Sequence, residues 1–338
     1  DNSPLGNWRT NSDNNTAITV LEGMKAYPKN KLIYRKGADV NLNDGGVVKF
    51  HEKVKINEND KSGFNSAKNA ARNADIVVMV LGEDGFQSGE GRSRTKIDLP
   101  GVQQELLEEV YKVNKNIVLV LMNGRPLNIN WADKNIPSIV EAWQLGTQTG
   151  NAIAQVLYGD YNPSGKLPMT FPRSVGQIPI YYNYKNTGRP GPKNEVFWSH
   201  YNDEVNTPLY PFGYGLSYTT FEYSNIAIDN KILKKNNSIN VSVELKNTGK
   251  FKGKEVVQLY IKDRYASVTR PVRELKGFEM IELNPGESKT VSFEISESLL
   301  RFYSANEVWE SEPGIFDIFI GTDSNASLQE NFKLIRKF

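Results

Sequence analysis

The chain has 338 residues with 41 Lys and Arg, 39 Asp and Glu, and no cysteine. This length allows two domains with full hydrophobic cores, and the net charge of +2 disfavours nucleic acid or an anionic membrane as a partner. Without cysteine, and with only His51 and His200, disulfides, thiolate chemistry and a multi-histidine metal site are excluded, so we expect no metal or other cofactor.

The first 180 residues alternate between two kinds of pattern. Short apolar runs bounded by turn residues predict buried parallel strands at 31–38, 75–82, 116–124 and 138–146. Helical spacing or composition predicts helices at 16–27, 65–74, 102–113 and 150–159. This alternation predicts an α/β domain with a mostly parallel sheet. Such a domain usually opens with a strand, so we expect that residues 1–180 lack their first strand.

The loop LGEDGFQSGEGRSRTKIDLP, residues 81–100, follows the second predicted strand. Its glycines fit neither the dinucleotide-binding spacing nor the phosphate loop. It carries two glutamates, Glu83 and Glu90, with Arg92 and Arg94 close enough in sequence to orient Glu90. A carboxyl group on a glycine-rich lid suits general acid catalysis at a glycosidic oxygen. The alternative from composition alone is a solvated loop with surface charges.

The remainder of the chain changes in character. Residues 160–221 are rich in proline, glycine and aromatic residues, which predicts a long ordered connection rather than a flexible linker. From 222 onward, alternating apolar and polar residues between turn signals predict about seven strands. We therefore expect an α/β sandwich domain at 1–180, an ordered linker at 181–221 and a fibronectin-III/immunoglobulin-like sandwich at 222–338.

Several long segments together resemble glycoside hydrolase family 3 of the bacterial β-glucosidase type. The resemblance lies in ADIVVMVLGEDGFQSGEGRSRTKIDLPG, NIVLVLMNGRPL, the stretch 139–182, PLYPFGYGLSYTTFEYS and the stretch 253–288, in one order along nearly the whole chain. It implies the family's α/β sandwich and fibronectin-III-like domains. The family's barrel, with its nucleophilic aspartate, has no counterpart in these residues, so the resemblance implies a C-terminal portion of a longer enzyme.

By the same resemblance, Glu90 corresponds to the family's general acid/base, and Glu83 to a supporting residue. The implied enzyme is a retaining, exo-acting glycosidase that acts on β-linked oligosaccharides or glycosides. Its nucleophile lies on a barrel domain outside this chain, about 5–5.5 Å from the carboxyl group of Glu90. Family habit places such an enzyme in the periplasm or outside the cell, and no membrane partner is expected.

Other residues carry weaker expectations. Trp8 and Arg94 are candidates for substrate binding, Trp8 because it lies in a loop that is expected to face the barrel. Trp143 falls within a predicted strand and is expected in the core. Arg125 has two open interpretations, an ion pair or a ligand contact. The competing function is a non-catalytic carbohydrate-binding or structural module, and a barrel of about 350–400 residues that co-purifies with the chain would distinguish the enzyme from it.

Overall fold

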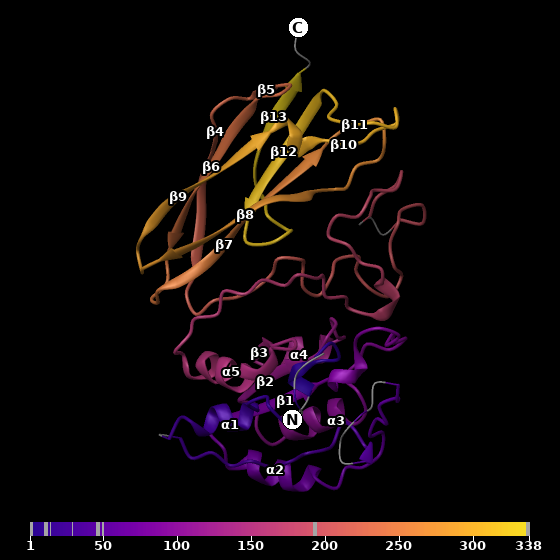
Figure 1. The fold of residues 1–338 in the computed structure, drawn as a ribbon, viewed down its shortest axis with the longest axis vertical. Coiled ribbons are helices and arrows are strands. Elements are labelled where there is room, and N and C mark those ends of the chain that lie inside the picture. The colour runs from indigo at the N-terminus through magenta and orange to yellow at the C-terminus, as the bar shows by residue number, and fades with distance from the viewer. Residues whose placement is uncertain are drawn as a thin grey trace. The chain divides into compact units, whose positions relative to one another are not determined.

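The computed structural model describes residues 3–9, 13, 15–28, 30–44, 48, 51–191 and 195–335, and every structural statement below concerns these residues. The chain forms two compact units, which are described separately (Figure 1). The first comprises Asp1–Tyr161 and Pro172–Ile178, and the second Asn162–Phe171 and Pro179–Phe338. These units group residues 162–171 with the second half, whereas the sequence placed them in a domain at 1–180. The predicted domain boundaries therefore stay a prediction.

The first unit is a three-stranded parallel sheet with helices on both faces. Its strands are β1 (Val77–Gly82), β2 (Ile117–Met122) and β3 (Ser138–Glu141), in the order β1-β2-β3. Its helices are α1 (Val20–Lys25), α2 (Phe64–Arg72), α3 (Gln103–Tyr111), α4 (Asn130–Asn135) and α5 (Thr149–Tyr158). Short 3-10 turns are η1 (Ser3–Leu5), η3 (Gly85–Gln87), η4 (Gly146–Gln148) and η5 (Val175–Gln177).

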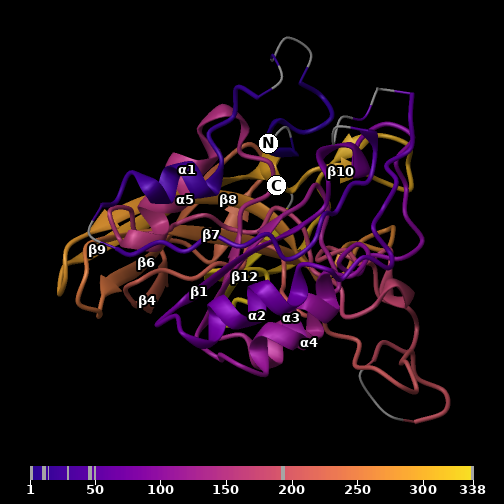
Figure 2. The ribbon, with the colours of Figure 1, turned by 90° about the horizontal axis from the view of Figure 1, so that it is seen from below.

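The core of this unit follows from the alternation of side chains along the strands. Val120 of β2 packs with Val20 of α1 and Ile153 of α5 on one face. Figure 2 shows α1 and α5 on one side of the strands and α2 and α3 on the other. Because both faces are covered, the central strand β2 is almost entirely buried, as its continuous apolar sequence predicts.

Local sequence signals explain where helix α1 begins and where helix α5 ends. The Thr19 hydroxyl accepts a hydrogen bond from the Glu22 N–H, and the Glu22 carboxylate accepts one from the Thr19 N–H at 2.8 Å. The two bonds form a complete capping box at the start of α1. Gly159 ends α5 in a left-handed conformation with a φ of 82°. Helix α4 was not predicted, because its six residues are too few to show a periodic pattern.

One predicted strand was wrong, and another was predicted too long. Residues 31–38 form no strand, and Leu32, Ile33 and Tyr34 are exposed. A strand needs a hydrogen-bonded neighbour, and the sheet of the described residues contains only β1, β2 and β3. The strand expected at 138–146 is β3 and stops at Glu141, because Trp143 turns the chain out of the sheet with a φ of 50°.

The second unit contains a sandwich of two sheets. The larger sheet has the order β5-β13-β12-β7-β8 and the smaller one β4-β6-β9, with β10-β11 as a separate hairpin. The long strands are β4 (Phe221–Ile228), β6 (Ser238–Asn247), β7 (Gly253–Asp263), β8 (Glu274–Leu283), β9 (Ser288–Ser296), β12 (Gly314–Gly321) and β13 (Leu328–Ile335). The short ones are β5 (Ile232–Lys234), β10 (Phe302–Tyr303) and β11 (Trp309–Glu310). A 3-10 turn, η6 (Glu297–Leu300), follows β9.

The inward-facing residues of both sheets form one apolar core, which includes Val243, Leu259, Ile318 and Phe332. The predicted fold class, an α/β layer with a parallel sheet followed by an all-β sandwich, is confirmed in these two units. None of the described helices has both the length and the apolar character needed to cross a membrane.

The aromatic residues of the connection before the sandwich stack within the second unit. The rings of Tyr182 and Phe212 lie 4.4 Å apart, and those of Tyr210 and Tyr214 lie 5.1 Å apart. Phe171 also forms an isolated bridge with Tyr210. These contacts agree with an ordered connection rather than a free linker.

Candidate functional site

Polar residues gather where the parallel strands of the first unit end. Glu83 directly follows β1, Asn123 directly follows β2, and Glu141 is the last residue of β3. Because parallel strands end at one edge of the sheet, these side chains converge there, which is where ligands bind in open α/β sheets. The loop predicted from the sequence, residues 81–100, leaves the sheet at this edge.

The first part of this loop is fixed by hydrogen bonds between its own side chains and backbone. Asp84 caps η3, since its Oδ1 accepts a hydrogen bond from the Phe86 N–H at 2.9 Å. The side chain of Gln87 accepts in return from the Asp84 N–H at 2.9 Å. Gly82 is required before this turn, because its φ is 142° and a Cβ there would collide with the carbonyl of Met122.

Glu83 is the buried anchor of the loop. Its side chain is 0% exposed, and its Oε1 accepts from Arg94 Nη1 at 2.7 Å and lies 3.0 Å from Arg125 Nε. The Gly124 N–H donates to its Oε2 at 3.2 Å. A buried carboxylate with two arginines and a backbone donor is satisfied as a charged group. Glu83 therefore holds structure together and has no free oxygen to offer a substrate.

Glu90 lies at the opposite extreme, exposed at the tip of the loop. It sits between Gly89 and Gly91, with φ values of 123° and 67°, in a turn that the Arg92 N–H closes by donating to the Gly89 carbonyl at 3.2 Å. L-residues with side chains rarely adopt these conformations. The glycines thus produce a sharp turn that presents the Glu90 carboxyl group outward.

The arginines expected to orient Glu90 have other partners. Arg94 bonds to Glu83, and its Nη2 donates to the Asp98 carbonyl at 3.0 Å. Arg92 donates from Nη1 to the Glu52 carbonyl at 2.9 Å and lies over the ring of Phe86. Both guanidinium groups therefore shape the loop, and Arg94 does so through Glu83.

Trp8 and Trp143, the two tryptophans discussed from the sequence, lie in different surroundings. Trp8 is 62% exposed, as an aromatic residue available for stacking would be. Trp143 was expected in the core of a strand, but it follows β3, is partly exposed, and has left-handed backbone torsion angles. Its N–H donates to Glu141 Oε1 at 3.1 Å, so the turn is fixed against the end of the strand.

Glu141 was missed by the sequence reasoning, although a single glutamate inside the apolar run SIVEAW was a usable signal. Burial raises the pKa of this carboxyl group to about 8, and the nearby charge of Glu83 acts in the same direction. Bonds from the Trp143 N–H and from Asn123 Nδ2, at 3.1 and 3.3 Å, lower the pKa and offset only part of this rise. Glu141 is therefore largely neutral near pH 7.

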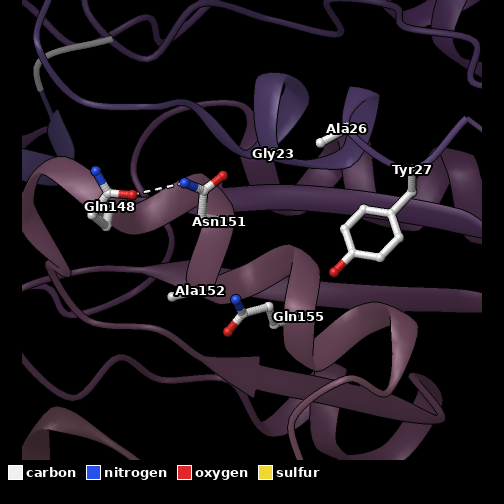
Figure 3. A pocket seen from close by; sticks show the side chains of 7 residues that line it. All are labelled: Gly23, Ala26, Tyr27, Gln148, Asn151, Ala152 and Gln155. Carbon is white, nitrogen blue, oxygen red and sulfur yellow. Dashed lines mark hydrogen bonds between the residues drawn. The ribbon is translucent and has the colours of Figure 1, made fainter.

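A surface groove elsewhere on the unit does not have the chemistry of a catalytic site. It lies between α1 and α5 and encloses about 490 Å³ (Figure 3). Its lining consists of Gly23, Ala26, Tyr27, Gln148, Asn151, Ala152 and Gln155. No carboxylate is among these residues, and Asn151 already bonds to Gln148 at 2.7 Å. The groove offers no carboxyl group, and the hydroxyl of its one titratable side chain, Tyr27, already bonds to Asp160, so the loop at the sheet edge is the better candidate.

Comparison with known families assigns both parts of the chain. Residues 1–218 match the family described as "Glycosyl hydrolase family 3 C-terminal domain". Residues 255–324 match the "Fibronectin type III-like domain". The two matches follow the order of the α/β unit and the β-sandwich.

Individual relatives extend these matches. A periplasmic beta-glucosidase of Salmonella typhimurium is 46% identical over 340 residues, which is 98% of this chain and 44% of that protein. A beta-xylosidase of Formosa agariphila is 45% identical over 91% of this chain and 40% of its own length. The chain thus spans less than half the length of these relatives.

A solved structure shares the fold of the whole chain. The beta-glucosidase of Listeria innocua in complex with isofagomine is 35% identical and has a TM-score of 0.88. The similarity covers 100% of this chain and 45% of that one. A second structure of the same enzyme, in complex with gluconolactone, has a TM-score of 0.88 over 99% of this chain.

Proposed function

The chain belongs to glycoside hydrolase family 3, and we propose that it supplies the general acid/base, Glu90, to a retaining, exo-acting β-glycosidase. The nucleophile of this enzyme lies on a barrel domain outside these 338 residues. The observation that carries the proposal is the contrast between the two glutamates of the loop. Glu83 is buried and ion-paired, whereas Glu90 is exposed at a turn whose base is anchored.

The reaction has two steps, with Glu90 in opposite protonation states. In the first, a barrel aspartate attacks the anomeric carbon while protonated Glu90 gives its proton to the departing glycosidic oxygen. In the second, the Glu90 carboxylate takes a proton from water, and the resulting hydroxide displaces the aspartate from the sugar. The anomeric configuration is retained because it is inverted twice. Geometry requires the two carboxyl groups to be about 5–5.5 Å apart.

The substrate class follows from the relatives and from the residues near the loop. The relatives are named beta-glucosidase and beta-xylosidase, which favours β-linked oligosaccharides or simple β-glycosides. The exposed ring of Trp8 suits stacking on a sugar face. For Arg94, the ion pair with Glu83 favours positioning of the loop over direct contact with the substrate.

Two further parts of the proposal concern organisation and location. We place the α/β sandwich domain at 1–180, the linker at 181–221 and the fibronectin-III-like domain at 222–338. We also place the enzyme in the periplasm or outside the cell, in line with the name of the Salmonella relative.

The test compares leaving groups in the complete enzyme, the chain with its barrel. For Glu90→Ala, kcat/KM for cellobiose or xylobiose should fall by roughly 10²–10⁴-fold, the usual contribution of a general acid. The kcat/KM for the matching 2,4-dinitrophenyl glycoside should change only a few-fold, because this leaving group departs without a proton. Glu58→Ala, an exposed loop glutamate of the same unit, is the control. An equal loss on both substrates, or none on either, would overturn the assignment.

A further inference from the structure

The side chain of Arg125 ties together three points of the loop that carries Glu90. Arg125 lies two residues past Asn123, after the end of β2. Its Nη2 donates to the carbonyl of Gln87 and to the carbonyl of Arg92, the latter at 2.8 Å. Its Nε lies 3.0 Å from Glu83 Oε1, close enough for an ion pair although the N–H is not aligned for a hydrogen bond.

The two carbonyls stand on either side of Glu90, three residues before it and two after it. Between them the backbone passes through Gly89 and Gly91, both with positive φ. A Cβ built on Gly91 would meet no atom within 4 Å, whereas one built on Gly89 would collide with the Asn7 side chain, so the turn is packed before Glu90 and open after it. Arg125 bonds to the backbone both before and after the turn, so it contributes to the position of the Glu90 carboxyl group.

A guanidinium group suits this place. Its planar fork directs several N–H groups at fixed angles, so that one side chain bridges acceptors on separate segments. A lysine carries the same charge, but its ammonium nitrogen stands at the position of the Arg Cζ, one bond short of the Nη2 that bonds to both carbonyls. The side chain of Arg125 is only 20% exposed, which limits competition from water for these bonds.

We infer that Arg125 is a positioning residue that holds the turn bearing Glu90 in place through the carbonyls of Gln87 and Arg92. The inference rests on the proposed function of Glu90 and deepens it. The sequence left Arg125 open between an ion pair and a ligand contact. The structure favours the ion pair and adds the two backbone bonds. A displacement of about 1 Å at a catalytic group is enough to cost a factor of about 100 in rate.

The first arm of the test needs no activity and uses the 338-residue chain. Trypsin cleaves after Arg92 only if its carbonyl leaves Arg125. In Arg125→Lys, the fragment that begins at Ser93 should form about tenfold faster, as expected for losing a hydrogen bond to a charged group. Pro126 follows the altered residue, so no new tryptic site arises. The control is Arg72→Lys, an exposed arginine on α2. An unchanged rate of cleavage would overturn the inference.

The second arm measures kcat/KM in the complete enzyme. Arg125→Lys should lower kcat/KM for cellobiose or xylobiose by about 10- to 100-fold, with the effect in kcat rather than KM. The 2,4-dinitrophenyl glycoside should be affected much less. A uniform loss on both substrates would mean a merely structural role and would overturn the inference. Should the lysine variant fail to fold, Arg125→Gln replaces it with the same expected pattern, because its shorter side chain ends at the depth of the Arg Nε and loses both carbonyl bonds.

The outcomes separate this inference from the function on which it rests. If Glu90→Ala shows no dependence on the leaving group, the proposed function fails, whatever Arg125→Lys does. If Glu90→Ala shows that dependence, and Arg125→Lys loosens the turn but lowers kcat/KM equally for both leaving groups, the function stands. The positioning role of Arg125 then fails.

Discussion

Glu141 provides the sharpest test of the buried polar edge of the sheet. Its carboxyl group lies between Asn123 and the Trp143 N–H, close enough to Glu83 for the two charges to repel. We predict that Glu141→Gln removes a strong pH dependence from the stability of the chain. Glutamine has nearly the shape of the protonated carboxyl group and does not titrate.

The magnitude follows from the pKa of Glu141, which burial raises from 4.5 to about 8. Between these values the folded protein retains a proton that the unfolded chain has lost, so the free energy of unfolding decreases as pH rises. The stabilisation is fully present below pH 4.5 and is lost as pH rises through about 8. The slope approaches about 1.4 kcal/mol per pH unit, which sums to roughly 3–4 kcal/mol between pH 5 and pH 8.

The assay is urea unfolding at several pH values between 5 and 8 at constant ionic strength. The difference in unfolding free energy between Glu141→Gln and the unaltered chain should move in favour of the variant by roughly 3–4 kcal/mol over this range. Comparing variants at each pH cancels the titration of all other groups. Glu58→Gln, an exposed glutamate, should show no such trend. A pH-independent difference for Glu141→Gln would refute the reasoning.

One further substitution in each unit tests a buried contact, an ion pair in the second unit and a helix–helix contact in the first. Lys166→Met leaves buried Glu255, 3.0 Å from the Lys166 ammonium group, without its cation, and the free energy of unfolding measured in urea should fall by about 3–5 kcal/mol; a loss under 1 kcal/mol would show that the pair is solvated. Gly23→Ala places a Cβ against the carbonyl of Gly150 where α1 crosses α5, and should lower the free energy of unfolding by about 1–3 kcal/mol. Gly176→Ala, which has room for the methyl group, should be near neutral. Equal shifts of the melting temperature for the two variants would contradict this packing.

Features that depend on neighbouring residues were predictable from the sequence. Helix α5 ends at Tyr158 because Gly159 adopts the left-handed conformation that a terminal glycine allows. Strand β2 is buried along its length, as its apolar run indicates. The glycines beside Glu90 adopt positive φ, a conformation that glycine allows and that a glycine-rich loop therefore makes possible.

Features that depend on distant residues were not predictable. Residues 31–38 have the composition of a strand, but a strand forms only where a partner offers backbone bonds. Arg94 stands close to Glu90 in sequence, yet it pairs with Glu83 across the loop. The bonds from Arg125 to Gln87 and Arg92 join segments more than 30 residues apart, and no periodic pattern encodes such contacts.

The most direct test of the central claim is whether azide replaces water when Glu90 is removed. In the complete enzyme with Glu90→Ala, turnover of a 2,4-dinitrophenyl β-glycoside should accelerate on adding azide and yield the β-glycosyl azide. Azide attacks the glycosyl-enzyme intermediate without needing a base, and the product keeps the β configuration because that attack is the second inversion. Release of free sugar alone, with no acceleration by azide, would contradict the assignment of Glu90 as the acid/base.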